Sequence, residues 1–102
     1  MLYRQGDVLI VPVKSIPKGA KPIQRENGRV ILAHGEVTGH AHALLERNVN
    51  MVEKDMRRFL EIAGGGASVV HEEHGTIKLD AGLYEVIRQR EYSPAAFRYV
   101  TD

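Results

Sequence analysis

Short apolar runs separated by turn residues recur along the chain. The first run extends from Val8 to Val13 and is rich in β-branched residues. It is bounded by Gly6 and Asp7 before it and by the sequence Pro-Lys-Gly at 17–19 after it. This pattern predicts a buried strand, with Pro12 marking a sheet edge because proline has no backbone donor.

The second run, residues 29–34, follows an Asn27-Gly28 pair that is typical of a tight hairpin turn. Its residues alternate as those of a half-buried strand do. In a regular strand, side chains two residues apart share a face. The alternation therefore predicts that His34 points in the same direction as Val30 and Leu32.

The middle of the chain fits two patterns. Apolar positions within residues 50–62 have helical spacing, but residues 58–62 also alternate as a strand does. Three glycines at 64–66 then lead directly into residues 67–71, which form another strand-like run. We therefore predict a hairpin that joins 58–62 to 67–71, and the helix over 50–62 stays open as an alternative.

The last third predicts strand, turn and strand, because residues 76–79 and 83–87 flank the turn sequence Asp80-Ala81-Gly82. The chain has 102 residues, which is the size of one domain. So many short strands indicate an all-β fold. We expect a single domain over residues 1–102, a small barrel or sandwich of short antiparallel strands.

The amino-acid composition limits the kinds of functional site that the protein can contain. The chain has no cysteine, so disulfides and thiolate metal sites are excluded and any metal must be held by nitrogen and oxygen. A net charge of +1 is far from the basic excess of a dedicated nucleic-acid binder. One stretch is locally basic and is a candidate phosphate-binding loop, with Lys14, Lys18, Lys21, Arg25 and Arg29.

The N-terminal apolar run is short and is interrupted by Pro12. It matches neither a signal peptide nor a membrane-spanning helix. We therefore expect a cytoplasmic protein with no membrane partner.

Histidine is the most unevenly distributed residue of the sequence. All five histidines fall within 41 residues, as His34, His40, His42, His71 and His74. In a strand over 40–46, His40 and His42 lie on one face about 6–7 Å apart, given a rise of about 3.3 Å per residue. Two imidazoles at that spacing can reach one metal ion, and Glu46 follows on the same face. The alternative is that the intervening apolar residues face the core and the histidines face water.

The second histidine pair has a less favourable spacing. On a strand, His71 and His74 point to opposite faces, so we expect only one of them to reach a site shared with His42. The sequence His-Glu-Glu-His at 71–74 is also one residue shorter than the His-Glu-x-x-His motif of zinc proteases. That reaction class is therefore not supported.

Two segments resemble the motifs of the cupin family of small metal-binding β-barrels. Gly35, His40, His42 and Glu46 are similar to the first motif, a glycine followed by His-x-His and a glutamate. The turn at 80–82, with Glu85 and Gln89, is similar to the second, in which a turn precedes a ligand. Together they cover residues 29–92. The sequence departs from the family pattern where Glu85 stands in place of a histidine ligand.

The cupin resemblance implies a barrel-like fold and a metal site. The metal ligands that it implies are His40, His42 and Glu46, with Glu85 or a histidine of the second pair as the fourth ligand, His74 being our first choice. Such a set of imidazoles and carboxylates suits Zn²⁺, Fe²⁺, Mn²⁺ or Ni²⁺. In a hydrolase, the ion acidifies bound water and a free carboxylate such as Glu36 or Glu72 acts as the general base.

A second hypothesis needs no metal. Two histidines, either His40 with His42 or His71 with His74, can act as general base and general acid in RNA cleavage. Lys78 or Arg88 would then stabilise the charge that develops on the phosphate.

A third hypothesis is a non-catalytic binding module, in which the histidines tune an interface. A candidate homodimer surface near the C-terminus contains Arg88, Arg90 and Arg98 among Tyr92, Phe97 and Tyr99. Of the three hypotheses, we favour a metal-dependent, hydrolytic enzyme. Its substrate would be a small molecule or RNA.

Overall fold

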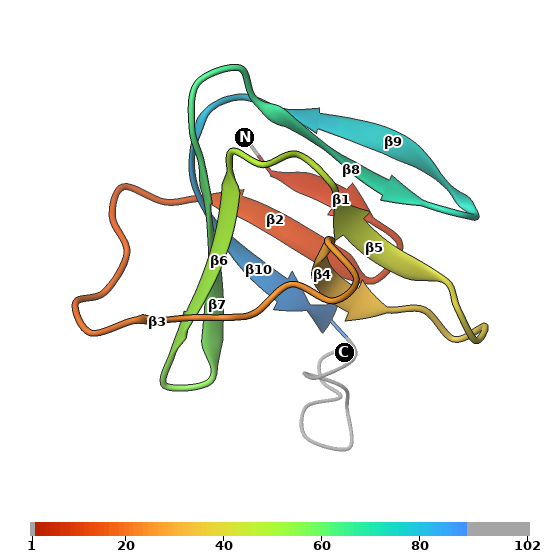
Figure 1. The fold of residues 1–102 in the computed structure, drawn as a ribbon, viewed down its shortest axis with the longest axis horizontal. Coiled ribbons are helices and arrows are strands. Elements are labelled where there is room, and N and C mark those ends of the chain that lie inside the picture. Colours follow the sequence, from red (N-terminus) through yellow and green to blue (C-terminus); the bar gives the residue numbers. More distant parts are fainter. Residues whose placement is uncertain (1, 90–102) are drawn as a thin grey trace.

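The computed structural model describes residues 2–89, which form a two-layered β-sandwich (Figure 1). Its strands are β1 (Tyr3–Gln5), β2 (Val8–Pro12), β3 (Lys21–Pro22), β4 (Val30–His34), β5 (Ala41–Leu44), β6 (Val49–Lys54), β7 (Arg57–Ile62), β8 (Ala67–His71), β9 (His74–Leu79) and β10 (Gly82–Arg88). The predicted all-β class is confirmed, as a sandwich of two open sheets. The arginines and aromatics from Arg90 onward, predicted as part of a dimer surface, lie outside the described residues.

Every strand pairing is antiparallel. One sheet has six strands in the order β1-β2-β10-β7-β6-β3, and the other has four in the order β4-β5-β8-β9. Within the part of the chain that the structure describes, no helix is long and apolar enough to span a membrane.

The core lies between the two sheets. Strand alternation directs one side of each strand inward, as in β10, where Tyr84 and Val86 are buried and Glu85 lies on the outer face. Both sheets contribute fully buried aliphatic side chains, among them Val8, Ile10 and Leu60 from the larger sheet and Leu32, Leu44, Val69 and Leu79 from the smaller one. Each such side chain contributes about 1.5–3 kcal/mol to folding.

The middle of the chain folds differently from our prediction. Residues 50–62 contain strands β6 and β7, which pair with each other, so the helix alternative is wrong. The predicted hairpin between 58–62 and 67–71 is also wrong. Strand β7 pairs with β6 and β10, whereas β8 pairs with β5 and β9 in the other sheet. The glycine loop at 64–66 therefore carries the chain from one sheet to the other.

A β-bulge changes the direction of His34. The register between β4 and β5 shifts between Ile31 and Ala33, so that Leu32 and Ala33 both join the core. His34 then points outward, with 65% of its side chain exposed, and pairs with Glu26 at 3.1 Å. The prediction that His34 shares the buried face of the strand is therefore wrong.

Two arginines of the larger sheet hold the bulged strand in place. Arg58 donates to the carbonyl oxygen of Leu32, and Arg88 donates through Nη2 to that of His34 at 2.7 Å. These hydrogen bonds satisfy carbonyl groups at the edge of the smaller sheet. They also bring Arg88 to the end of the sandwich where the histidines gather.

Candidate functional site

Four histidines meet in a cleft of about 350 Å³ at one end of the sandwich. Three connections form its walls: the β1–β2 turn, the loop between β4 and β5, and the β8–β9 hairpin. The side chains that line it are the imidazoles of His40, His42, His71 and His74, the carboxylates of Asp7, Glu36 and Glu73, the guanidinium of Arg88, and Val37. Among the residues predicted from the sequence, the cleft thus contains all four of these histidines, Glu36 and Arg88.

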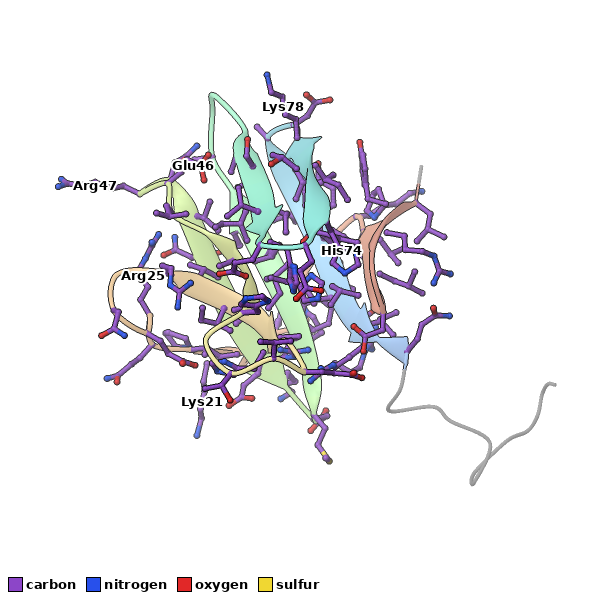
Figure 2. The ribbon with its side chains drawn as sticks, turned by 90° about the vertical axis from the view of Figure 1, so that its right-hand side faces the viewer. Lys21, Arg25, Glu46, Arg47, His74 and Lys78 are labelled. Atoms are coloured by element: carbon purple, nitrogen blue, oxygen red, sulfur yellow. The ribbon has the colours of Figure 1, made fainter. Side chains whose placement is uncertain are left out.

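Four other predicted site residues lie elsewhere, and one of them, Glu72, accepts a hydrogen bond from the Ala41 amide at 3.0 Å. Glu46 and Lys78 line a separate cleft beside the glycine loop, and Glu46 accepts a hydrogen bond from the Ser68 amide at 3.0 Å. Figure 2 shows both near the top of the view and His74 lower, near the middle of the molecule. Glu85 forms a two-pronged ion pair with Arg57, with both N–O distances at 2.9 Å. The structure therefore does not bring together the ligand set that the cupin resemblance implies.

The β8–β9 hairpin places both of its histidines in the cleft. Glu72 and Glu73 form a two-residue turn, and His71 pairs directly with His74 across it. Residues that flank such a turn lie on the same face of the hairpin. Their ring centroids are 4.6 Å apart. The expectation that only one of the two reaches the site is therefore wrong, because it assumed one continuous strand.

His42 is the buried centre of the cluster, with only 3% of its surface exposed. Its ring centroid lies 4.3 Å from that of His71 and 5.7 Å from that of His74. On the other side of the ring, Nδ1 lies 2.8 Å from Oε1 of the buried Gln5. A carbonyl-type oxygen only accepts, so Nδ1 carries the proton and donates it. The neutral ring consequently has its lone pair on Nε2.

Burial and the neighbouring imidazoles keep His42 neutral. Desolvation is the main effect that lowers its pKa, followed by the proximity of His71, and the pKa falls from 6.5 to about 4. The carboxylate of Asp7 opposes this shift from a distance of 3.8 Å between Oδ1 and Nε2. At neutral pH, Nε2 of His42 is therefore an unprotonated acceptor directed toward Asp7.

Two of the other three imidazoles, those of His40 and His71, contact Glu73 of the hairpin turn. The Glu73 amide donates to Nδ1 of His71 at 2.9 Å, so neutral His71 carries its proton on Nε2. Nδ1 of His40 lies 2.7 Å from a carboxylate oxygen of Glu73, in an orientation that does not make a regular hydrogen bond. His71 thus offers the cleft an N–H donor, whereas His42 offers a lone pair.

The β1–β2 turn brings its backbone against the rings. Gly6 has a φ of 60°, and a Cβ atom placed there would lie 2.9 Å from Nε2 of His74 and 3.3 Å from Cε1 of His42. Only glycine combines this backbone conformation with so close an approach. Asp7 follows it, and Arg88 donates to Oδ2 of Asp7 at 3.2 Å. The turn therefore lies against the rings of two histidines, His42 and His74, and supplies one carboxylate, that of Asp7.

These groups are close to a metal-binding arrangement without forming one. As the side chains stand, no group of three or more His, Asp or Glu residues within 2–89 is arranged to hold a metal ion. Atoms that share one ion at bond lengths of about 2.1 Å lie roughly 3.0–3.4 Å apart. The 3.8 Å between His42 Nε2 and Asp7 Oδ1 exceeds that range by about half an ångström. One ion could therefore be shared by this pair only if the two atoms moved closer together.

Comparison with known proteins identifies the family of the chain, but the description of that family states no function. Residues 4–89 match the family model described as "Domain of unknown function (DUF8820)". The chain belongs to this family. No curated protein and no solved structure matches it. The match includes every residue of the histidine cleft, so the DUF8820 domain contains the whole candidate site.

Sequence reasoning missed three residues of this DUF8820 site, Gln5, Asp7 and Glu73. Gln5 and Asp7 flank Gly6, where the sequence indicates only a strand boundary. They lie more than thirty residues before His42 in the chain and reach it only because β1 meets the β8–β9 hairpin. The available signal was the Gly6-Asp7 turn that precedes the predicted strand at 8–13.

The low pKa of His42 predicts a dependence of stability on pH. Between pH 6.5 and 4, His42 of the unfolded chain binds a proton that the folded chain does not, so the free energy of unfolding falls as the pH falls. The loss attributable to His42 approaches about 3 kcal/mol below pH 4. Urea titrations of metal-free protein across this range should show a shallower slope in His42→Gln than in the wild type. Equal slopes would contradict the assignment.

Proposed function

We propose that the cleft binds a divalent metal ion through His42, His74 and Asp7, and that the protein uses this ion in a hydrolytic reaction. The observation that carries the proposal is the lone pair on Nε2 of His42, which faces the Asp7 carboxylate at the turn where Nε2 of His74 also lies. Two imidazoles and a carboxylate form a ligand set that suits Zn²⁺, Fe²⁺, Mn²⁺ or Ni²⁺.

The charges around the cleft favour a cation over a polyanion. Among residues 2–89, three carboxylates line it, against the single guanidinium of Arg88, which is itself paired with Asp7. An RNA backbone is recognised by an excess of cations. Of the two cations considered for an RNA-cleaving site, Arg88 lines this cleft and Lys78 lines a separate one. The metal-independent ribonuclease hypothesis is therefore the weaker one, and a small molecule is the better substrate class.

The residues around the proposed ligands can support hydrolysis. A bound ion would lower the pKa of water and polarise the substrate. The Nε2 proton of His71 can hydrogen-bond to a substrate oxygen, because Nδ1 accepts the Glu73 amide. Glu36 and Glu73 are exposed carboxylates at the rim of the cleft, which is where a general base must meet incoming water.

Metal titration of the purified protein tests the proposal. After treatment with a chelator, isothermal titration with Zn²⁺, Mn²⁺ and Ni²⁺ should show one high-affinity site per chain for at least one ion. Elemental analysis of the untreated protein should find the same stoichiometry. If no ion binds, the proposal fails. RNA cleavage that survives the chelator would instead support His42 and His71 as an acid–base pair.

A further inference from the structure

Gln5 joins both sheets to the centre of the histidine cluster. It is only 2% exposed, at the end of β1 in the larger sheet. Its amide nitrogen donates to the carbonyl oxygens of Val69 at 3.1 Å and Gly75 at 2.9 Å, in β8 and β9 of the smaller sheet. Its amide oxygen accepts from Nδ1 of His42 at 2.8 Å. Three hydrogen bonds thus use both donors and the acceptor of one side chain.

The two carbonyl groups fix the orientation of the amide. If the Gln5 amide were turned over, its oxygen would face the oxygens of Val69 and Gly75, and three acceptors would meet without a proton between them. Its NH₂ group would then face Nδ1 of His42. The observed orientation is the one that satisfies every group, and burial makes an unsatisfied group costly.

We propose that Gln5 is the positioning residue that fixes the tautomer of His42, and so reserves Nε2 of that ring for a ligand in the cleft. The choice of protonated nitrogen in a neutral imidazole is set by the hydrogen bond that the other nitrogen makes. Histidines that bind metals characteristically donate their second N–H to such an oxygen. The tautomer follows from the hydrogen bonds alone, and only the identity of the ligand as a metal ion rests on the proposed function.

The replacement Gln5→Met tests this role, because methionine has a similar length but neither accepts nor donates as an amide does. In long-range ¹H–¹⁵N spectra of metal-free protein near neutral pH, wild-type His42 should be the Nδ1–H tautomer. In Gln5→Met, Nε2 should gain proton occupancy, and metal affinity should fall about 10- to 100-fold. Gln5→Glu keeps an acceptor for Nδ1 but sets its second oxygen against the carbonyl oxygens of Val69 and Gly75, so it should keep the proton on Nδ1 of His42 at a cost in stability.

Asn48→Leu is the matched control. The Asn48 side chain also donates to backbone carbonyl groups, those of Ala63, Gly64 and Gly66, but it lies outside the cleft. This variant should lose stability without changing the His42 tautomer or metal affinity. A loss of affinity equal to that of Gln5→Met would show that Gln5 acts only through general stability, and would overturn the inference.

The spectrum of the wild type tests the predicted His42 tautomer even if Gln5→Met fails to fold. An Nε2–H tautomer at His42 would overturn the inference directly. A wild-type protein with the Nδ1–H tautomer but no metal affinity would refute the proposed function and leave the role of Gln5 intact. The two proposals can therefore fail separately.

Discussion

Replacing His74 by alanine should weaken divalent-metal binding by about a hundredfold or more, while the free energy of unfolding stays within about 0.5 kcal/mol of the wild type. The His74 side chain is exposed at the end of the β8–β9 hairpin, so its truncation removes little core area. As a proposed direct ligand, it should matter more than an outer partner of a ligand, whose loss typically costs 10- to 100-fold. Isothermal titration and urea unfolding of the same preparations measure both quantities.

His34→Ala is the matched control for His74→Ala. His34 is also an exposed histidine, but it pairs with Glu26 outside the cleft. Its replacement should leave metal affinity unchanged within experimental error. If His34→Ala and His74→Ala reduced affinity equally, binding would be a non-specific property of surface histidines, and the cleft would lose its proposed role.

His42→Ala is a less selective test than the sequence suggests. From the sequence alone, a site histidine is expected to contribute chemistry rather than stability. In the structure, His42 is buried and satisfies Gln5 Oε1, so its removal leaves an unpaired acceptor and a cavity. An unsatisfied buried acceptor costs about 1–3 kcal/mol. A loss of metal binding in His42→Ala must therefore be judged beside His74→Ala, which separates the two effects.

Local alternation predicted most of the strands, though not β1, β3 or β6, and it did not predict their partners. The run at 8–13 and the strands around the turn at 80–82 form as predicted, because β-branched and alternating residues suit a half-buried pleated surface. The assignment of strands to sheets depends on contacts between distant segments, as with β7 and β8. A bulge between Ile31 and Ala33 shifts the register by one residue and turns His34 outward, and no local pattern marks it.

The candidate site was predictable to the extent that its residues are neighbours in sequence. His40 and His42 share the cleft as predicted, although His40 precedes β5 and only His42, the buried member, belongs to the strand. Glu46 was expected on the same face, but β5 ends at Leu44, so the alternation does not continue to it. The carboxylate of the cleft turn comes instead from Asp7, which no spacing rule connects to His42.

Replacing Gly66 by alanine should lower the free energy of unfolding by roughly 2–5 kcal/mol, because the residue adopts φ 71° where the chain crosses between the sheets. A Cβ atom at Gly66 would lie 2.6 Å from the carbonyl oxygen of Leu79, and backbone cannot move aside as a flexible side chain can. Gly64→Ala is the control, since no atom outside its chain neighbours lies within 4 Å of its Cβ position. Its effect should stay within about 0.5 kcal/mol.

The same crossover explains why the histidines meet. Because the loop transfers the chain to the smaller sheet, Val70 of β8 pairs with Ala43 of β5, and the next residue, His71, comes to lie against His42. A simple hairpin would have placed β8 beside β7, in the other layer of the sandwich. Urea unfolding of Gly66→Ala and Gly64→Ala tests the close approach of this loop to the Leu79 backbone. Equal, small losses would mean that residue 66 tolerates a side chain, which this approach does not allow.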